Sequence, residues 1–128
     1  MLLLDTDILV DVLRRHLPAL AWLNASVDQV AVPGYVAMEL FQGCRDKNEQ
    51  ARVQRVLRDF VMVWLLPEAC DQALSVFANA SLSHNLGILD ALIGQLAVSL
   101  NVPLYTFNEK HYTAIPHLRT VQPYAKES

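Results

Sequence analysis

Charged residues, cysteines and long hydrophobic runs are all scarce in this sequence, and each shortage excludes a class of protein. Only 18% of the 128 residues are charged while 53% are hydrophobic, a balance that excludes an intrinsically disordered chain. The two cysteines, Cys44 and Cys70, have neither CxxC nor Cys/His zinc spacing, so we expect reduced, mostly buried thiols in a cytoplasmic protein. The net charge of −3 gives no overall attraction to nucleic acid, although acidic metal ligands would contribute to that charge and still bind cations.

No part of the sequence predicts an export signal or a membrane span. The apolar run at the beginning ends after four residues and has no basic region before it, which is unlike a signal peptide. The longest charge-free stretch, residues 91–108, contains Gly94, Gln95, Asn101 and Pro103, so it predicts a helix, a turn and a strand. The length of the chain suits one hydrophobic core, and we expect a single domain over residues 1–128.

Short strands and helices alternate along the sequence. Residues 49–60 illustrate a helix, because Val53, Val56, Leu57 and Phe60 fall on one face. The alternation predicts an α/β fold with a mostly parallel central sheet of about five short strands, flanked by helices. The expected strands cover residues 2–4, 30–32, 61–66, 102–107 and 120–122, and the expected helices cover residues 8–15, 18–24, 35–44, 49–60, 68–80 and 88–100.

Three acidic residues stand at element ends or core boundaries in this pattern. Asp5 follows the first strand, Glu39 lies in an apolar helix, and Asp90 lies alone in the first turn of the most hydrophobic helix. Each has a purely structural explanation: helix capping for Asp5, a solvent-facing position for Glu39 and interaction with the helix dipole for Asp90. Carboxylates gathered at the carboxyl ends of parallel strands instead indicate a hard cation such as Mg²⁺ or Mn²⁺. Such an ion activates a bound water toward a phosphodiester.

Four segments of the sequence, LLLDTDILVD, VAMELFQG, ILDALIGQLA and LYTFNEKHY, resemble the PIN-domain proteins, and specifically the toxin ribonucleases of VapBC-type toxin–antitoxin pairs. The resemblance covers nearly the whole chain and implies a single PIN-like nuclease domain. It also implies a Mg²⁺- or Mn²⁺-dependent endoribonuclease that cleaves RNA, forms a homodimer and is blocked by a small cognate antitoxin. The family's three acidic metal ligands fall on Asp5, Glu39 and Asp90, with Thr6 orienting the first of them and Asn108 completing the catalytic site.

Several residues near these segments have an open role. Asn108 stands where many relatives carry aspartate and others asparagine, so a second metal would bind weakly or only with substrate. His111 stands where an acid is common, and of three roles, positioning water, contacting phosphate or packing at the strand end, we favour packing. Asp7 is expected to cap the helix or support the site, whereas Asp11 is expected on the exposed face of the first helix.

Basic side chains close to these segments are candidates for contact with RNA phosphates. They are Arg52, Arg55, Lys110 and, when protonated, His111. Arg52 and Arg55 belong to a helical stripe that ends at Arg58, and a solvated helix face is the interpretation we favour for that stripe.

Two other functions fit parts of the sequence. A receiver-like or phosphoryl-transfer α/β domain would use the acids on either side of Thr6 as an aspartyl-phosphate motif, but it leaves Glu39 and Asp90 without a task. A catalytically weak PIN-like interaction module would keep the fold without turnover, an alternative that the uncharged Asn108 leaves open.

Overall fold

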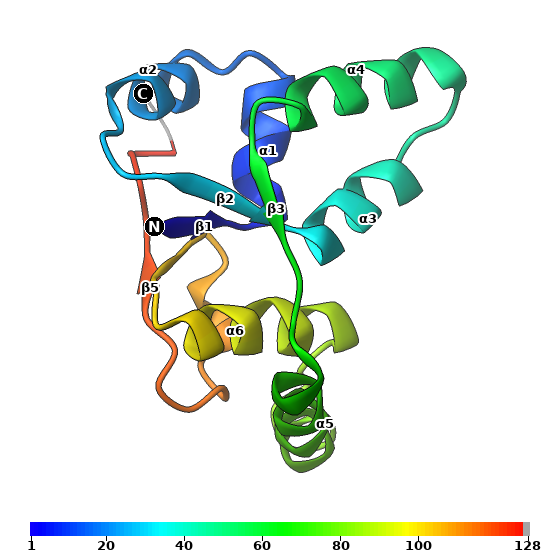
Figure 1. The fold of residues 1–128 in the computed structure, drawn as a ribbon, viewed down its shortest axis with the longest axis vertical. Helices are drawn as coiled ribbons and strands as arrows, with labels where there is room; N and C mark the ends of the chain where they lie inside the picture. Colours follow the sequence, from blue (N-terminus) through cyan, green and yellow to red (C-terminus); the bar gives the residue numbers. More distant parts are fainter. Residues whose placement is uncertain (127–128) are drawn as a thin grey trace.

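The structure is a computed structural model that describes residues 1–126, and its elements alternate as the sequence predicts (Figure 1). The strands are β1 (Leu2–Leu4), β2 (Val30–Pro33), β3 (Val61–Val63), β4 (Leu104–Tyr105) and β5 (Thr120–Val121). The helices are α1 (Thr6–Leu13), α2 (Leu17–Ala25), α3 (Gly34–Gln42), α4 (Lys47–Leu57), α5 (Pro67–Ala80) and α6 (Ile88–Leu100), with a short 3₁₀ helix, η1 (Glu109–Tyr112).

The strands form one parallel sheet in the order β3-β2-β1-β4-β5, which confirms the predicted α/β fold. The chain moves from β1 to β3 in one direction and then returns past β1 to β4. The carboxyl ends of β1 and β4 therefore form the topological switch point, where open α/β sheets bind their ligands. The order also differs from the 2-1-3-4-5 order of receiver domains, so the receiver-like alternative is wrong.

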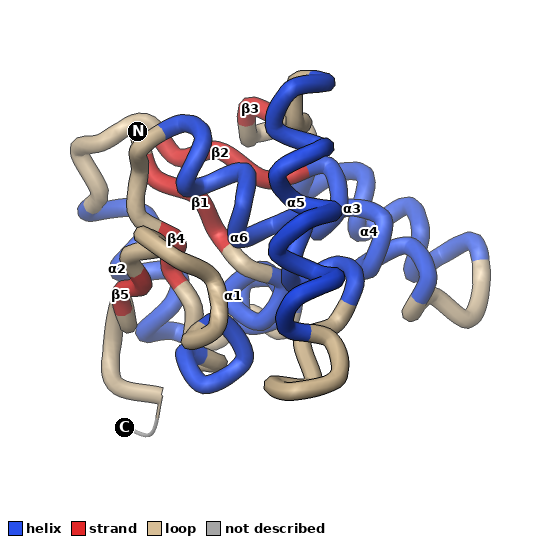
Figure 2. Tube along the Cα trace, turned by 90° about the horizontal axis from the view of Figure 1, so that it is seen from below, coloured by secondary structure: helices blue, strands red, loops and turns tan. Residues whose placement is uncertain are grey.

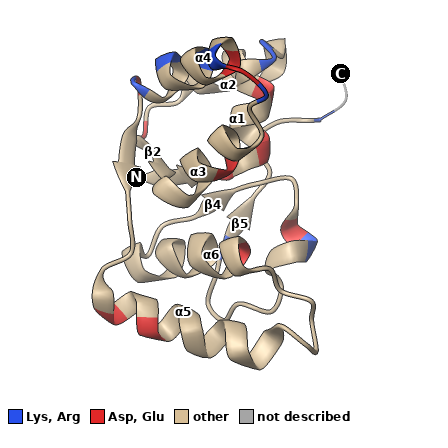
Figure 3. Ribbon diagram, turned by 90° about the vertical axis from the view of Figure 1, so that its right-hand side faces the viewer, with Lys and Arg blue, Asp and Glu red and all other residues tan. Residues whose placement is uncertain are grey.

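Helices cover both faces of this sheet. In Figures 1 and 3, α1, α2 and α4 lie on one side, and α5 and α6 lie on the other. Figure 2 views the molecule from the side of the second layer, with α5 and α6 in front of β1 and β2. This division follows from right-handed crossovers, because the connection from β3 to β4 runs across the sheet in the opposite sense to the earlier ones.

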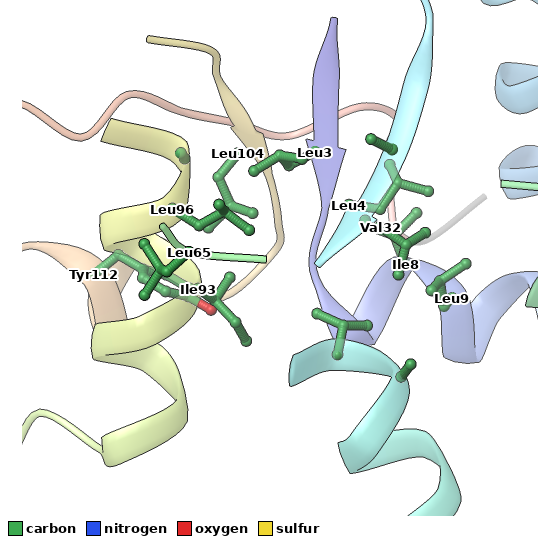
Figure 4. Close-up of a cluster of buried hydrophobic side chains, with 14 of the residues drawn as sticks. Leu3, Leu4, Ile8, Leu9, Val32, Leu65, Ile93, Leu96, Leu104 and Tyr112 are labelled. Atoms are coloured by element: carbon green, nitrogen blue, oxygen red, sulfur yellow. The ribbon is translucent and has the colours of Figure 1, made fainter. Parts of the chain in front are cut away.

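The hydrophobic core surrounds β1, whose three leucines are all buried. Gly94 lets α6 approach the segment after η1, because a Cβ at this position would clash with the Ile115 side chain. The core therefore fixes the carboxyl end of β1 relative to α6 and η1. Figure 4 shows the side chains packed around β1, among them Ile8, Leu9, Val32, Ile93, Leu96 and Leu104.

Several element boundaries differ from the predictions for identifiable reasons. Helix α1 begins at Thr6 and not at Ile8, because the Asp5 carboxylate accepts a hydrogen bond from the Thr6 N–H and caps the helix. Strand β3 ends at Val63, and the Leu65 N–H donates to the Tyr35 hydroxyl instead of to a neighbouring strand. The predicted strand over residues 102–107 shortens to Leu104–Tyr105, and η1 was not predicted.

Two predictions about burial were wrong. Asp11 is not on an exposed face: it is only 6% exposed and accepts hydrogen bonds from Tyr124 and Lys126. Cys70 is exposed and Cys44 is half-buried, so neither thiol lies in the core. Within residues 1–126, the helices are too short or too polar to cross a membrane.

Candidate active site

Asp5 is the most constrained carboxylate at the switch point. It directly follows β1, and its N–H donates to the Tyr105 carbonyl of β4 at 3.0 Å. Its side chain is 5% exposed, with Oδ1 accepting from the Thr6 N–H and Oδ2 accepting from the Thr106 and Tyr112 hydroxyls at 2.8 and 2.9 Å. These donors satisfy both carboxylate oxygens in a site from which water is largely excluded.

Glu39 reaches the same region from α3. Its Oε1 accepts a hydrogen bond of 2.8 Å from the Thr6 hydroxyl, so Thr6 connects the first acid to the second. The Thr6 side chain orients Glu39, and only its backbone N–H contacts Asp5. We predicted that the Thr6 hydroxyl orients Asp5. That prediction was wrong, because the hydroxyl donates to Glu39.

Asp90 enters the site from the first turn of α6. Burial is the largest cause that raises the pKa of Asp90, and the negative charges of Asp5 and Glu39 raise it further, while His111 lowers it. The three predicted acids are therefore close enough to influence one another. The His111 Nδ1 lies 3.8 Å from an Asp90 carboxylate oxygen and its side chain is 61% exposed. His111 faces the site, so the favoured prediction that it packs at the strand end was wrong.

The segment after β4 completes this edge of the sheet. Asn108 is exposed, and its N–H donates to the Thr106 hydroxyl, which itself donates to Asp5. Asp7 accepts from the Phe107 N–H at 2.8 Å and does not cap α1, so it holds this segment against the helix. Burial and the charge of Asp5 raise the pKa of Asp7 to about 6.

Thr106 and Tyr112 are the site residues that sequence reasoning did not select. Both are buried, and together they supply two of the donors to Asp5. Burial, followed by the charges of Asp5 and Asp90, raises the pKa of the Tyr112 hydroxyl, so it remains a donor at neutral pH. The LYTFNEKHY segment contains both residues, but only folding shows that they point to a carboxylate about a hundred positions earlier.

The chemistry of this donor set fits a hard divalent cation. It consists of carboxylate and hydroxyl oxygens, which Mg²⁺ and Mn²⁺ prefer. Burial raises the pKa of Asp90 most, and the negative charges of Asp5 and Glu39, which a cation would offset, raise it further. Within residues 1–126, no three Asp, Glu, His or Cys side chains are already positioned as a preformed metal site. The acids would have to converge further when an ion binds.

The basic candidates are divided between two places. Lys110 is exposed in η1, next to His111. Arg52 lies on α4 and lines a hollow of about 330 Å³ that also contains Thr6 and Glu39. Arg55 lies on the same helix and lines a neighbouring hollow with Arg52.

Comparisons with known proteins identify the family to which this fold belongs. The PIN domain family model matches residues 2–115. Ribonuclease VapC from Rickettsia bellii (strain RML369-C) is 30% identical over 131 residues, which cover 94% of each chain. A toxin–antitoxin complex from Klebsiella pneumoniae superposes with a TM-score of 0.77 at 25% identity, covering 97% of this chain and 98% of that one. VapBC2 from Rickettsia felis, bound to a DNA fragment from the VapBC2 promoter, superposes with a TM-score of 0.80 at 20% identity. The match covers 94% of this chain and 96% of that one.

Proposed function

The chain belongs to the PIN-domain family and, within it, to the VapC group, and we propose that it is a divalent-metal-dependent endoribonuclease. The observation that carries the proposal is the gathering of Asp5, Glu39 and Asp90 from three separate elements at the switch point of the sheet. A cation between them would explain why one buried and two half-buried acids of like charge are kept together.

The proposed roles divide between metal binding and support. Asp5, Glu39 and Asp90 would hold Mg²⁺ or Mn²⁺, which supplies a more acidic water and offsets charge on the phosphoryl oxygens. Thr6 fixes the Glu39 carboxylate, and Asn108 would hold water or substrate beside Asp5. These assignments place the RNA phosphodiester at the carboxyl end of β1.

Lys110 and His111 are the proposed phosphate contacts on the α6 side of the site. Both side chains are exposed, and His111 lies 3.8 Å from Asp90. Asp7 would act indirectly, by holding the Phe107 backbone and therefore the position of Asn108.

We further propose that the protein is the toxin of a type II toxin–antitoxin pair and works as a homodimer. The K. pneumoniae toxin–antitoxin complex, 25% identical over 97% of this chain, supports the antitoxin part of this proposal. The homodimer is what the resemblance to VapBC-type toxins implies. A small protein encoded beside this chain should co-purify with it and inhibit RNA cleavage, and light scattering should give the mass of two chains.

The decisive test is cleavage of a 5′-labelled RNA by the full chain, freed of any bound antitoxin, with Mg²⁺ or Mn²⁺. We expect Asp5→Asn and Asp90→Asn to lower the rate by at least the roughly 10–100-fold that loss of a metal-site group costs, and EDTA to abolish it. Asn still caps helices, so Asp5→Asn should keep the fold of α1.

Asp28→Asn is the matched control, because Asp28 is exposed in the loop before β2 and the substitution removes the same charge. It should cleave at the wild-type rate. Cleavage that survives in Asp5→Asn and Asp90→Asn would contradict the proposal. A folded wild-type chain that binds but never cleaves RNA would instead favour the interaction module.

A further inference from the structure

Basic residues are concentrated on one side of the molecule. Seven of the ten Lys and Arg residues fall between residues 14 and 58. Figure 3 shows them on and around α4, whereas α5 and α6 carry none. The residues are Arg14, Arg15, Arg45, Lys47, Arg52, Arg55 and Arg58.

Four of these arginines form a continuous group, which we call the arginine track: Arg14, Arg15, Arg52 and Arg55. Arg14 and Arg15 follow α1, and Arg52 and Arg55 lie on α4. The Arg52 guanidinium donates a 2.7 Å hydrogen bond to the Leu13 carbonyl, which holds the two groups of arginines together. All four are exposed, and none forms an ion pair with another residue between positions 1 and 126.

The arginine track begins at the proposed active site. Arg14 and Arg52 line the hollow of about 330 Å³ that contains Thr6 and Glu39. Arg15 and Arg55 line the adjoining hollow, and Arg52 is common to both. Positive charge therefore leads from the carboxylates over the carboxyl end of α1 to α4.

Unpaired arginines repel one another, and their planar forks match phosphate oxygens. The first hollow also has apolar walls from Val10, Leu13, Leu40 and Val53, which suit a ribose or a base. We propose that the arginine track binds the backbone of a single-stranded RNA substrate that runs from the carboxylates toward α4. This inference rests on the proposed function, and it requires a substrate that extends several nucleotides beyond the cleaved bond.

Charge complementarity favours RNA over an acidic protein segment as the occupant. An acidic peptide in the first hollow would approach Glu39, which lines the same hollow as Arg14. An RNA strand reaches that point already neutralised by the cation that the acids would hold. The phosphates of the RNA that follow this point then contact the arginine track.

The test separates binding from cleavage. Binding of a fluorescent 20-nucleotide oligouridylate is measured with Ca²⁺ in place of Mg²⁺, over a range of salt concentrations, with Arg14→Gln, Arg55→Gln and the charge-matched control Arg58→Gln. Arg58 lies three residues beyond Arg55 on α4 and lines a different hollow with Phe41 and Met62. Circular dichroism checks that each variant is folded.

We expect Arg14→Gln and Arg55→Gln each to weaken binding by roughly threefold to tenfold and to reduce the slope of log affinity against log salt by about 0.7. Arg55→Lys should restore the slope, because it restores the charge. Arg58→Gln should bind as the wild type does. A trinucleotide, which is too short to extend from the carboxylates past the first hollow to Arg55, should bind Arg55→Gln as it binds the wild type.

Equal affinity and equal salt slopes for Arg14→Gln, Arg55→Gln and Arg58→Gln would overturn the inference. It would also be overturned if Arg14→Gln and Arg55→Gln weakened binding of a polyglutamate peptide but not of RNA, because the track would then belong to an acidic protein partner. Since no cleavage is needed, a chain that binds RNA through the arginine track but does not cleave it would contradict only the proposed function.

Discussion

At the scale of single residues, the Tyr112 hydroxyl helps to fix the position of the Asp5 carboxylate by donating a hydrogen bond to it. It is one of three donors to a carboxylate that is 5% exposed, and the ring itself is 2% exposed. A buried acceptor that loses a donor retains its desolvation cost, which is larger for a charged group than for a neutral one. Tyr112 therefore contributes both to the stability of the fold and to the geometry of the proposed active site.

Tyr112→Phe should lower the free energy of unfolding by about 1.5–3 kcal/mol, the range for a hydrogen bond to a charged group. It should also slow RNA cleavage, because Asp5 gains freedom to rotate. Urea unfolding and the cleavage rate measure the two effects.

Tyr105→Phe is the control for loss of a phenolic oxygen. Tyr105 lies in β4, and its hydroxyl makes no hydrogen bond to any residue from 1 to 126. This variant should unfold with nearly the wild-type free energy. If Tyr112→Phe is equally harmless, the proposed support of Asp5 by Tyr112 is wrong.

At the scale of elements, residues 122–126, which we call the C-terminal strap, fasten α1 to the end of β4. The Tyr124 hydroxyl and the Lys126 ammonium donate to the buried Asp11 carboxylate at 2.7 and 2.8 Å. The Tyr124 ring packs edge-on against Phe107 with centroids 4.9 Å apart, and Lys126 lies 4.7 Å above that ring. The C-terminal strap therefore packs against Phe107, the residue that precedes Asn108.

Asp11 should make the stability of the protein depend on acid pH. Burial alone would raise the pKa of Asp11, but hydrogen bonds from Lys126 and Tyr124 outweigh it and lower the pKa below its ordinary value of 3.8. The unfolded chain thus takes up a proton before the folded one does. The contribution of Asp11 is complete above pH 3.8 and is lost as the pH falls through the lowered folded value.

Asp11→Asn should therefore be less stable than the wild type by about 1 kcal/mol at neutral pH, and the difference should shrink as the pH falls below 3.8. Urea unfolding at several pH values between 2 and 7 measures the effect. Asp28→Asn, which removes a charge at an exposed position, is the control. A difference between Asp11→Asn and the wild type that stays constant with pH would contradict the role assigned to Asp11.

At the scale of the whole molecule, the two halves of the sheet share one core around β1. Trp22 of α2 packs on Tyr105 of β4, with centroids 5.3 Å apart, while Trp64 after β3 packs on Tyr35 at 5.1 Å. The two tryptophans therefore report on opposite sides of the switch point. A single domain requires both sides to unfold together, because neither retains a complete core alone.

Thermal unfolding of Trp22→Phe and Trp64→Phe should show this cooperativity. In each variant, fluorescence of the remaining tryptophan should change at the same midpoint as the far-UV circular dichroism. Separate midpoints within one variant would show two independently folding parts and would contradict the prediction of a single domain over residues 1–128.

The sequence by itself determined the alternation of elements, because apolar periodicity and turn residues are local signals. It also indicated the carboxylates: an acid directly after a buried strand, as Asp5 is, and an isolated acid in an apolar helix, as Asp90 is, are visible without a structure. Glu39, an acid within an apolar helix, was visible in the same way, and the PIN-like segments added Thr6, Asn108 and the order of the site residues.

Only the tertiary structure decided which groups meet. The contacts of Thr6 with Glu39, of Tyr112 with Asp5 and of Tyr124 with Asp11 join residues 33 to 113 positions apart. Such partners carry no local signal, because side-chain direction and burial depend on how the layers pack. Asp11 is an example. The sequence predicted it on the exposed face of α1, but Tyr124 and Lys126 of the C-terminal strap cover it in the folded chain.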